Sequence, residues 1–504
     1  MKVYLTTPLY YLNDVPHIGH AYTQIATDVL ARYYRKEGYD VFFLTGTDEH
    51  GQKMEQSARA AGKAPQVFVD EQVEKFKALW KRLNISYDDF IRTSESRHGE
   101  VVQKVFKKLL EKGDIYLGEY EGWYCTPCES FFLPSQLDNG KCPDCGRAVH
   151  WVKEESYFFK MSKYQNQLLE HIRDHKDFIL PTTRRNEISS FIKEGLKDVS
   201  VSRTSFSWGV PLPEPVFRPG HIAYVWIDAL LNYVSAPGFM REEEKFKRYW
   251  PADVHLIGKD ILKFHAVIWP ALLLALDLPL PRTVFAHGWW TVEGEKMSKS
   301  RGNVVDPWKV TEQFGVDSFR YFLLREVAFG LDGDFSTEAF IRRYNADLAN
   351  DLGNLFQRTL SMVERYFHGK VPATGKVAPE DEKLRFKTEE LPQKIRKHYE
   401  AIELHNVLSQ IWDLITLANR YIEETAPWKL AKTNPERLGT VLYNLLEALR
   451  WLAFYLSPFL PETSEQMNRQ LGSAGLKSPP VWGQIMPGGT IRKGQPLFPR
   501  MEKQ

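Results

Sequence analysis

The sequence of 504 residues lacks several features that would assign a class of protein at once. Its longest apolar run, at positions 267–276, is half as long as the ~20 residues that a membrane-spanning helix needs. Its N-terminus lacks the apolar centre and small-residue cleavage site of a secretory signal. The formal net charge is only +2, so any polyanionic partner must be held by local patches. We therefore expect a cytoplasmic protein with no membrane association.

Cysteine is scarce, and its four copies fall in one short window. They form the pattern C-x2-C, thirteen residues, C-x2-C. Two disulfides are one interpretation, but in a reducing compartment this spacing predicts four thiolates around one tetrahedral zinc ion. Four protein ligands leave no coordination position for a substrate. We therefore expect one structural Zn²⁺ per chain, bound by Cys125, Cys128, Cys142 and Cys145.

The order of the apolar runs predicts an α/β protein with a Rossmann-like, doubly wound parallel sheet. Residues 3–7 and 41–51 read as strands on either side of an amphipathic helix that ends at Gly38, which is a βαβ unit. A cysteine-containing insertion splits the sheet, and an all-α bundle follows from about residue 335. The predicted segments are 1–113 (first half of the sheet domain), 114–220 (insertion with the cysteine knuckle), 221–290 (second half), 291–335 (a lysine-bearing loop and the residues after it), 336–470 (helical bundle) and 471–504 (a tail packing back on the body).

Two histidines stand where the first predicted strand gives way to a helix. We expect Pro16 in the first helical turn, with His17 and His20 on one face beside unpaired backbone N–H groups that favour an anion. Gly19 lets a bulky ligand approach the backbone closely. Two capping or core histidines are the alternative. No G-x-G-x-x-G motif follows the first strand, which argues against a nicotinamide or flavin cofactor.

The stretch EGEKMSKSRGN, residues 293–303, has no apolar face to bury. Its Lys296 and Lys299 follow the last predicted strand, so we expect them to reach the same edge of the sheet as the histidines. A lysine ammonium on its long flexible stem can follow charge as it moves onto a leaving pyrophosphate. A solvated surface loop is the alternative for this stretch alone.

The strings HIGH (residues 17–20) and KMSKS (residues 296–300), in this order, resemble the paired signatures of class I aminoacyl-tRNA synthetases. The knuckle and the stretches TTPLYYLNDVPHIGH, TGTDEHG, YVWIDALLNYVSA, GKDILKFH and APWKL are similar to methionyl-tRNA synthetases. The spacing between the two signatures leaves no room for the large editing domain of the leucyl, isoleucyl and valyl enzymes. Cysteinyl-tRNA synthetase, the nearest alternative in the class, needs an open zinc position. A smaller nucleotidyltransferase, the alternative outside it, needs neither knuckle nor bundle.

This resemblance implies the activation of L-methionine with ATP to methionyl-AMP and pyrophosphate, followed by transfer of methionine to the 3′ end of tRNA(Met). The catalytic residues that it implies are His17, His20, Lys296 and Lys299. The implied contacts to ATP, which brings Mg²⁺ with it, are made by these four residues together with Gly19, Gly258 and Asp260.

The implied methionine pocket consists of Leu9, Tyr11, Asp48, Trp226, Ala229, Leu230, Tyr233, Ile261 and His265. A polarisable thioether suits aromatic surroundings, and the Asp48 carboxylate suits the substrate ammonium. A tyrosine hydroxyl or an imidazole N–H can point at the sulfur. The four residues from Trp226 to Tyr233 also follow the spacing of any buried helix face, so core packing is the alternative for them.

In the helical domain the resemblance assigns the anticodon to Asn354, Arg358 and Trp428. Splayed bases are bound by aromatic stacking and hydrogen bonds, which these side chains offer, although a solvated face and interhelical packing are the alternative. Further phosphate contacts are expected from Arg325, Arg342 and Arg343. The expected partners are initiator and elongator tRNA(Met). Some family members carry an added C-terminal barrel, for which too few residues remain, so we expect a monomer, with a separate tRNA-binding subunit in trans as the alternative.

Overall fold

The computed structural model describes residues 1–12, 15–126, 128–132, 134–143, 145–296, 303–473 and 478–502. The chain divides into two compact units. The first unit comprises Met1–Pro16, Asp40–Lys81 and Ser86–His287, and the second comprises His17–Tyr39, Arg82–Ile85 and Gly288–Gln504. Among the described residues, no helix combines the length and the apolar character that crossing a membrane requires.

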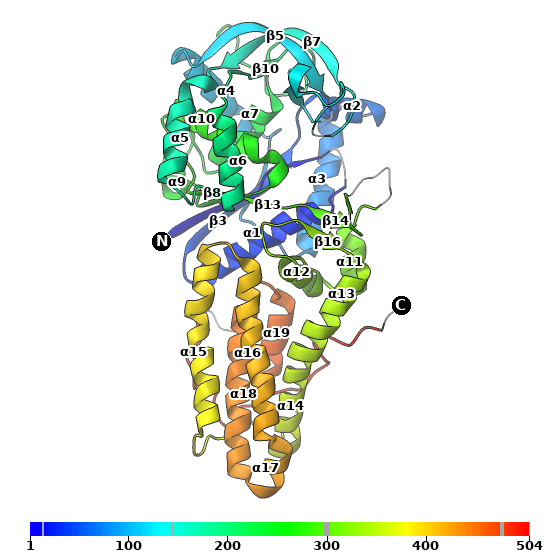
Figure 1. Ribbon diagram of the computed structural model, residues 1–504, viewed down its shortest axis with the longest axis vertical. Coiled ribbons are helices and arrows are strands. Elements are labelled where there is room, and N and C mark those ends of the chain that lie inside the picture. Colours follow the sequence, from blue (N-terminus) through cyan, green and yellow to red (C-terminus); the bar gives the residue numbers. More distant parts are fainter. Residues whose placement is uncertain are drawn as a thin grey trace. The chain divides into compact units, whose positions relative to one another are not determined.

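A parallel sheet of seven strands forms the centre of the first unit (Figure 1). Strands β1 (Lys2–Thr6) and β3 (Asp40–Asp48) pair in parallel, with Leu5 opposite Phe43, which confirms the predicted βαβ opening. Strand β12 (Val254–Gly258) pairs with the other edge of β1, so the strand order reverses there. Sheets of α/β proteins bind ligands beyond the carboxyl ends of their strands at such a reversal. In spatial order the strands are β2 (Tyr10–Tyr11), β3 (Asp40–Asp48), β1 (Lys2–Thr6), β12 (Val254–Gly258), β13 (Thr283–His287) and β8 (Ile179–Leu180), with β4 (Asp89–Arg92) also on β3.

These strands are buried along most of their length because helices of the same unit supply apolar partners. In β3, every residue after Asp40 is buried, as is typical of a parallel strand covered on both faces. The helices of this unit are α2 (Gln52–Ala60), α3 (Pro65–Arg82), α4 (Ser96–Glu111), α5 (Gln165–Asp174), α6 (Thr182–Lys193), α7 (Val225–Leu230), α8 (Asn232–Ser235), α9 (Glu243–Tyr249) and α10 (Trp269–Ala275).

The insertion between the two halves of the sheet is built on a long antiparallel hairpin, visible as the cyan arch in Figure 1. Its strands are β5 (Ile115–Cys125), β6 (Ser130–Phe132), β7 (His150–Phe159) and β9 (Val199–Ser200), and β10 (Ser202–Arg203) pairs with β11 (Ile222–Ala223) beside it. Strand β8 also falls between residues 114 and 220, yet it pairs in parallel with β13 and extends the main sheet. A run of two paired residues is too short to give a periodic signal in the sequence.

The second unit is mostly helical and includes the first helix of the chain, α1 (Ile18–Lys36). A small sheet of β15 (Glu295–Lys296), β14 (Trp290–Val292) and β16 (Gly333–Phe335) precedes the bundle. Helix α13 runs through a π-helical segment, Tyr344–Gly353, into α14. The helices are α11 (Pro307–Phe314), α12 (Val316–Arg325), α13 (Thr337–Arg343), α14 (Asn354–Phe367), α15 (Pro379–Glu400), α16 (Leu404–Thr425), α17 (Pro427–Thr433), α18 (Pro435–Leu456) and α19 (Pro461–Gln470).

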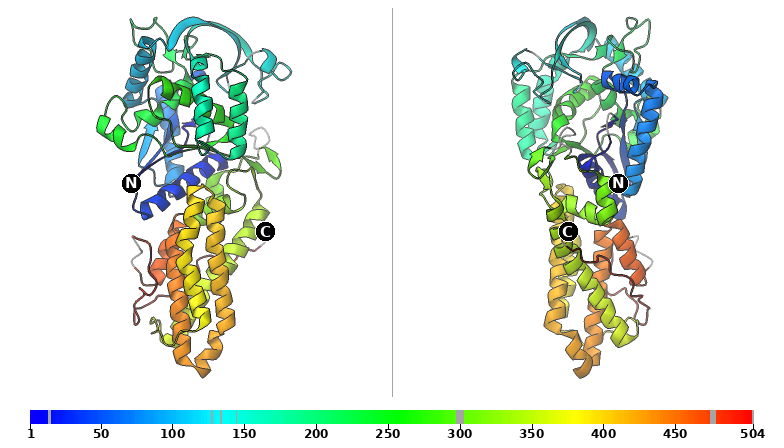
Figure 2. Two further views of the ribbon diagram at one scale, coloured as in Figure 1. Left: turned by 60° about the vertical axis from the view of Figure 1, so that its left-hand side comes forward. Right: turned by 90° about the vertical axis from the view of Figure 1, so that its right-hand side faces the viewer.

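Helices α15, α16 and α18 pack against one another, and the left view of Figure 2 shows them side by side in yellow, gold and orange. Helix α1 is attached to this bundle. Tyr33 of α1 stacks on Tyr399 of α15 with ring centroids 3.6 Å apart, and Glu37 accepts a hydrogen bond from Arg396 at 3.0 Å. The irregular tail runs over helices of the same unit, where the Ile485 and Pro499 carbonyls accept hydrogen bonds from tyrosine side chains. The helix bearing both histidines therefore belongs structurally to the bundle unit.

Candidate functional site

Asp48 is the last residue of β3 and lies at the carboxyl edge of the sheet, since the strand ends three residues before the predicted end at residue 51. The side chain is 6% exposed, and its Oδ1 atom has no hydrogen-bond partner within the part of the chain that the structure describes. Burial raises the pKa of Asp48 well above its ordinary value, and the negative potentials of Asp228, Glu129 and Glu49 raise it further. A buried carboxyl group whose pKa is strongly shifted and which has an unpartnered oxygen is a candidate functional group.

The turn after Asp48 is held by side chains from distant parts of the first unit. Glu49 accepts two hydrogen bonds from the guanidinium of Arg92, at 2.7 and 2.9 Å, and another from Ser94 at 2.5 Å. The indole N–H of Trp208 donates to the Glu49 carbonyl at 2.6 Å. The turn therefore has one fixed conformation, and with it the direction of the Asp48 side chain.

A buried aspartate on α7 completes this support. Asp228 contacts His50 Nδ1 at 2.7 Å with one oxygen and His98 Nε2 at 2.8 Å with the other. Burial alone would raise the pKa of Asp228, but the two imidazoles lower it to about 2. The aspartate is therefore ionised at neutral pH and joins α7 to the turn of β3 and to α4.

Tyr233 and His265, both predicted to contact methionine, form a hydrogen bond of 2.7 Å between Tyr233 Oη and His265 Nε2. His265 Nδ1 lies 3.0 Å from the Ile261 carbonyl, which only accepts, so Nδ1 carries the ring proton. Burial lowers the pKa of His265 to about 4, so the ring is neutral and Nε2 accepts a hydrogen bond from the Tyr233 hydroxyl. The Tyr233 hydroxyl and the His265 N–H, which were predicted to point at the substrate sulfur, thus donate to protein acceptors instead. The polarisable faces of the aromatic rings are therefore the main contact available to a thioether sulfur.

The other predicted pocket residues lie on the same unit but are less closely connected. Leu9 packs so tightly on Gly46 of β3 that a side chain built there would come 2.9 Å from Leu9 Cδ2. Tyr11 donates its hydroxyl to the His50 carbonyl at 2.9 Å. Trp226 stacks on Phe264, between Ile261 and His265 in sequence, with centroids 3.7 Å apart. Ala229 is buried, and Leu230 and Tyr233 belong to the hydrophobic core, as the core-packing alternative expected.

Gly258 ends β12 at the same edge of the sheet as Asp48. A side chain at Gly258 would place its Cβ only 2.5 Å from Asp260 Oδ1, so this position requires glycine while Asp260 keeps its present orientation. The Asp260 side chain is exposed. The predicted nucleotide contacts Gly258 and Asp260 therefore form one compact turn.

His17 and His20, in the second unit, cap the first turn of α1. The Gly19 N–H donates to His17 Nδ1 at 3.1 Å, the His17 N–H donates to His20 Nδ1 at 3.2 Å, and the two rings stack with centroids 3.9 Å apart. The helix begins at Ile18, so the prediction that Pro16 occupies the first turn is wrong, because His17 is the capping residue. Burial lowers the pKa of His20 well below its usual value, and the neighbouring His17 ring lowers the pKa of His20 further. Since backbone N–H groups occupy both Nδ1 atoms, the neutral rings carry their protons on Nε2.

Strand β15 ends at Lys296, and Val305 lies beside the N-terminus of α1. Thr291 pairs with Lys296 across the small sheet, and the Ile18 N–H donates to the Val305 carbonyl at 3.3 Å. Lys299 and the rest of residues 297–302 lie outside the described residues, and only the backbone of Lys296 is described. A backbone hydrogen bond thus joins Val305, which follows the KMSKS string, to Ile18 of the HIGH string.

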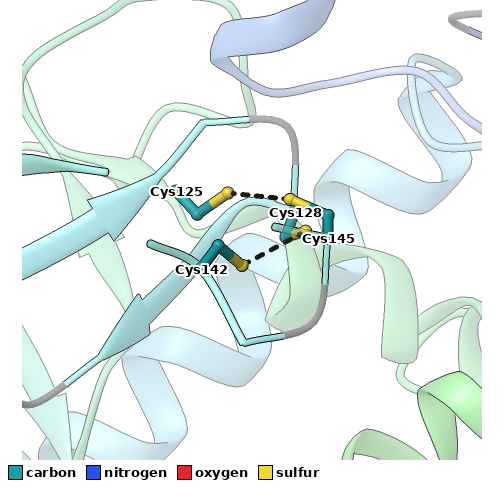
Figure 3. A group of neighbouring side chains, drawn as sticks. All are labelled: Cys125, Cys128, Cys142 and Cys145. Carbon is teal, nitrogen blue, oxygen red and sulfur yellow. Dashed lines mark hydrogen bonds between the residues drawn. The ribbon is translucent and has the colours of Figure 1, made fainter. Parts of the chain in front are cut away.

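The four cysteines lie together at the end of the β5–β7 arm, and Figure 3 shows their sulfur atoms pointing toward one another. All four are free thiols, so the two-disulfide interpretation is wrong. Cys125 and Cys145 have sulfurs 3.6 Å apart, and those of Cys128 and Cys142 are 3.9 Å apart. A tetrahedral metal with sulfur bonds of about 2.3 Å has sulfur–sulfur edges of about 3.8 Å, close to these two distances, and all four sulfurs lie within 4.8 Å of one another, so the cluster could hold one metal ion.

In the helical domain, the structure brings two of the three predicted anticodon residues together. The Arg358 guanidinium lies over the ring of Trp428 at 5.8 Å and pairs with Glu423 at 2.8 Å. Trp428 is 40% exposed, so a large part of this aromatic side chain is accessible to a ligand. Asn354 is exposed at the start of α14, after the π-helical segment.

The three arginines expected to contact phosphate have protein partners. Arg342 and Arg343 pair with Glu326, at 3.8 and 2.9 Å, and Arg325 donates to Ser409 at 2.8 Å. These contacts explain their orientation without a nucleic acid.

Comparison with known proteins gives the family. The model of class I tRNA synthetases (M) matches residues 3–150 and 134–360, and the anticodon binding domain of methionyl tRNA ligase matches residues 371–498. The methionine--tRNA ligase of Caldanaerobacter subterraneus subsp. tengcongensis is 55% identical over 99% of this chain and 79% of its own length.

Two solved structures of Mycobacterium tuberculosis methionyl-tRNA synthetase are similar throughout. The complex with methionyl-adenylate has a TM-score of 0.96 at 45% identity, covering 99% of this chain and 100% of that one. The free form has a TM-score of 0.89 at 42% identity, covering 100% and 99%. The chain therefore belongs to the methionyl-tRNA synthetases, a family of class I aminoacyl-tRNA ligases with an anticodon-binding domain for tRNA.

Proposed function

We propose that the chain activates L-methionine and charges tRNA(Met) through the residues described above, and that Asp48 binds the substrate ammonium. The observation that carries this proposal is the buried Asp48 carboxyl group, whose Oδ1 lacks a partner among the described residues. Leu9, Tyr11, Trp226 and the Tyr233–His265 pair supply the apolar and aromatic surroundings of the thioether. Ala229, Leu230 and Ile261 fill the remaining wall.

In the first step, a methionine carboxylate oxygen attacks the α-phosphorus of ATP, forming the acyl phosphate bond as the bond to pyrophosphate breaks. The Nε2–H groups of His17 and His20 donate to the phosphates, and Gly19 gives the nucleotide room. Lys296 and Lys299 stabilise charge on the leaving pyrophosphate. Gly258 and Asp260 contact the nucleoside, and Mg²⁺ accompanies ATP through its phosphates and water.

In the second step, the terminal adenosine 2′-hydroxyl of tRNA attacks the adenylate carbonyl and AMP leaves with the bonding electrons.

We assign the CAU anticodon, in both initiator and elongator tRNA(Met), to Asn354, Arg358 and Trp428. Backbone phosphates of the tRNA are assigned to Arg325, Arg342 and Arg343. The metal at the four cysteines is proposed to be a structural Zn²⁺. The reducing cytoplasm would keep the four cysteines from forming disulfides, so that their thiolates can bind the metal. We propose a monomer, and retain the predicted division of the chain at residues 113, 220, 290, 335 and 470.

The lysine assignment is tested by pyrophosphate exchange with ATP in the absence of tRNA, using each standard amino acid in turn. Methionine should support exchange, and Lys299→Ala should lower kcat about 100-fold while the KM for methionine stays within about threefold, because this charge acts on the transition state. Lys309→Ala, at an exposed position on α11, is the matched control. Full activity of the Lys299 variant, or exchange driven by another amino acid, would contradict the assignment.

The anticodon assignment predicts a separate effect on tRNA. Trp428→Ala should lower kcat/KM for tRNA(Met) about 30-fold, since stacking of a base on an aromatic ring contributes about 2 kcal/mol. Pyrophosphate exchange should be unchanged because it needs no tRNA. Phe386→Ala removes another exposed aromatic ring, on α15, and serves as control. Equal loss in both variants would show a general effect of surface aromatics instead.

A further inference from the structure

The cysteine knuckle and the proposed methionine pocket meet at one residue, Glu129, which directly follows Cys128. Glu129 is 3% exposed although it lies next to a surface turn. Its backbone has φ of +49°, a left-handed conformation that disfavours residues with a side chain relative to glycine. A buried acidic side chain at a position that favours glycine indicates that the side chain itself is needed.

The Glu129 carboxylate reaches the helix that follows the Asp48 turn. Helix α2 has Gly51 at its N-cap and therefore no capping side chain of its own. Glu129 Oε1 accepts the Lys53 N–H at 3.0 Å and so caps this helix from the insertion. A second contact from the knuckle, Thr126 Oγ1 to Gln52 Oε1 at 3.3 Å, lies beside it.

The same carboxylate also contacts tyrosines on both sides. Glu129 Oε1 lies 3.4 Å from the Tyr11 hydroxyl, and Glu129 Oε2 accepts a hydrogen bond from Tyr124 of β5. A side chain at Gly51 would come 2.6 Å from Tyr11 Oη and 2.9 Å from Glu129 Oε1, so three segments meet at this point. A shift of Glu129 would therefore move Tyr11 or the Asp48 turn.

The backbone of Glu129 makes the contact with the second half of the pocket. Its carbonyl accepts the hydroxyl of Tyr224, which precedes α7 and is two residues from Trp226. One residue of the knuckle thus contacts the segments that carry Tyr11, Asp48 and Trp226. All of these contacts lie within the first unit.

We propose that Glu129 is a positioning residue through which the four-cysteine knuckle sets the geometry of the methionine pocket. The inference rests on the proposed roles of Asp48, Tyr11 and Trp226. It predicts that loss of the carboxylate weakens methionine binding while the ATP site and metal binding are preserved.

The test compares Glu129→Gln and Glu129→Gly with wild type in pyrophosphate exchange, with metal content measured on each purified protein. Both variants should raise the KM for methionine about tenfold, with the KM for ATP and the metal content within about twofold of wild type. Glycine accepts the left-handed backbone, so the knuckle turn is preserved in that variant. Glu121→Gln, on an exposed residue of β5, is the matched control.

A second arm measures methionine binding by calorimetry, without ATP, before and after metal removal with a chelator. Chelation should raise the Kd of wild type about tenfold and that of Glu129→Gly by clearly less, because the connection is already cut there. Lower metal content with an unchanged KM for methionine, or fully additive effects of chelation and mutation, would overturn the proposal. Methionine-specific exchange by wild type is required in either case, so its absence would indicate failure of the proposed function itself.

Discussion

Replacing Asp48 with asparagine is expected to lower kcat/KM for methionine about a thousandfold in pyrophosphate exchange. The variant keeps the size of the side chain but cannot neutralise the substrate ammonium, and loss of one partner of a desolvated charge pair costs about 4 kcal/mol. Asp40→Asn, at the other end of β3, is the control, because its partner Arg248 is exposed and the pair lies far from the carboxyl edge. A loss below tenfold in the Asp48 variant would refute the assignment.

The same substitution is expected to stabilise the free protein. Burial and the neighbouring acids raise the pKa of Asp48, so the folded chain keeps the proton of this carboxyl group to a higher pH than the unfolded chain does. The stability from this proton is complete below the ordinary pKa of a carboxyl group and is lost as pH rises through the folded-state pKa. Asparagine carries no such penalty, so Asp48→Asn should raise Tm by a few degrees, more at high pH than at low pH.

Thermal unfolding between pH 5 and 9 measures this difference, with and without methionine. Methionine should raise the Tm of wild type and leave that of Asp48→Asn unchanged, because only the carboxylate pairs with the ammonium. The KM of wild type for methionine should fall as pH rises, since the carboxylate must ionise before it can bind. A variant less stable than wild type at every pH would mean that the Asp48 carboxyl group is a structural element and not a substrate site.

Residues whose role depends on position in a strand or helix could be predicted from the sequence. His17 and His20 begin an amphipathic helix, and the cysteine spacing is local. The identity of the methionine and anticodon residues came from the resemblance and not from the pattern: Arg358 and Trp428 lie 70 positions apart, and nothing in their separate helices indicates that they meet.

Residues that work through distant partners were not predicted. Asp228 stands in the apolar stretch WIDAL, where its charge was the only available signal, and its partners His50 and His98 lie 178 and 130 positions away. Glu129 was not singled out because it directly follows Cys128, and the cysteine pattern was the only signal read from that stretch. The short strand β8 belongs to the main sheet because it pairs with the edge of β13. The pattern of apolar residues within β8 does not indicate this pairing. Long-range pairing decides all three cases, and a single sequence does not show it.

The second prediction with a large expected effect concerns the buried arginine that holds α1 in the second unit. Arg320 of α12 is fully buried, and one of its guanidinium nitrogens donates to Asp28 of α1 at 2.7 Å. Its other hydrogen bonds, all between 2.8 and 3.0 Å, go to the backbone carbonyls of Leu83, Pro458 and Phe459. The arginine therefore joins the helix that carries His17 and His20 to the end of α18, inside the second unit.

Arg320→Met should lower the free energy of unfolding by about 3–5 kcal/mol, because it takes the buried cation away from the buried Asp28 carboxylate, which keeps only its bond from Arg32, and leaves three backbone carbonyls without their donor. Urea denaturation followed by circular dichroism measures this loss. Arg325→Met, on the same helix but with a single side-chain acceptor in Ser409, should cost about 1 kcal/mol and is the matched control. Equal costs at both positions would show that burial of the aliphatic stem, and not the hydrogen-bonded charge, stabilises the arrangement.

A double variant separates the ion pair from its surroundings. Asp28 also accepts a hydrogen bond from Arg32 at 2.7 Å, and the Arg32 side chain is 21% exposed and can turn toward water when its partner is lost. Asp28→Asn combined with Arg320→Met should therefore be less destabilised than the sum of the single variants, since no buried charge remains uncompensated. Pyrophosphate exchange at temperatures where the double variant stays folded should then show lower kcat, because the N-terminal turn of α1 has lost its fixed support while its histidines are intact.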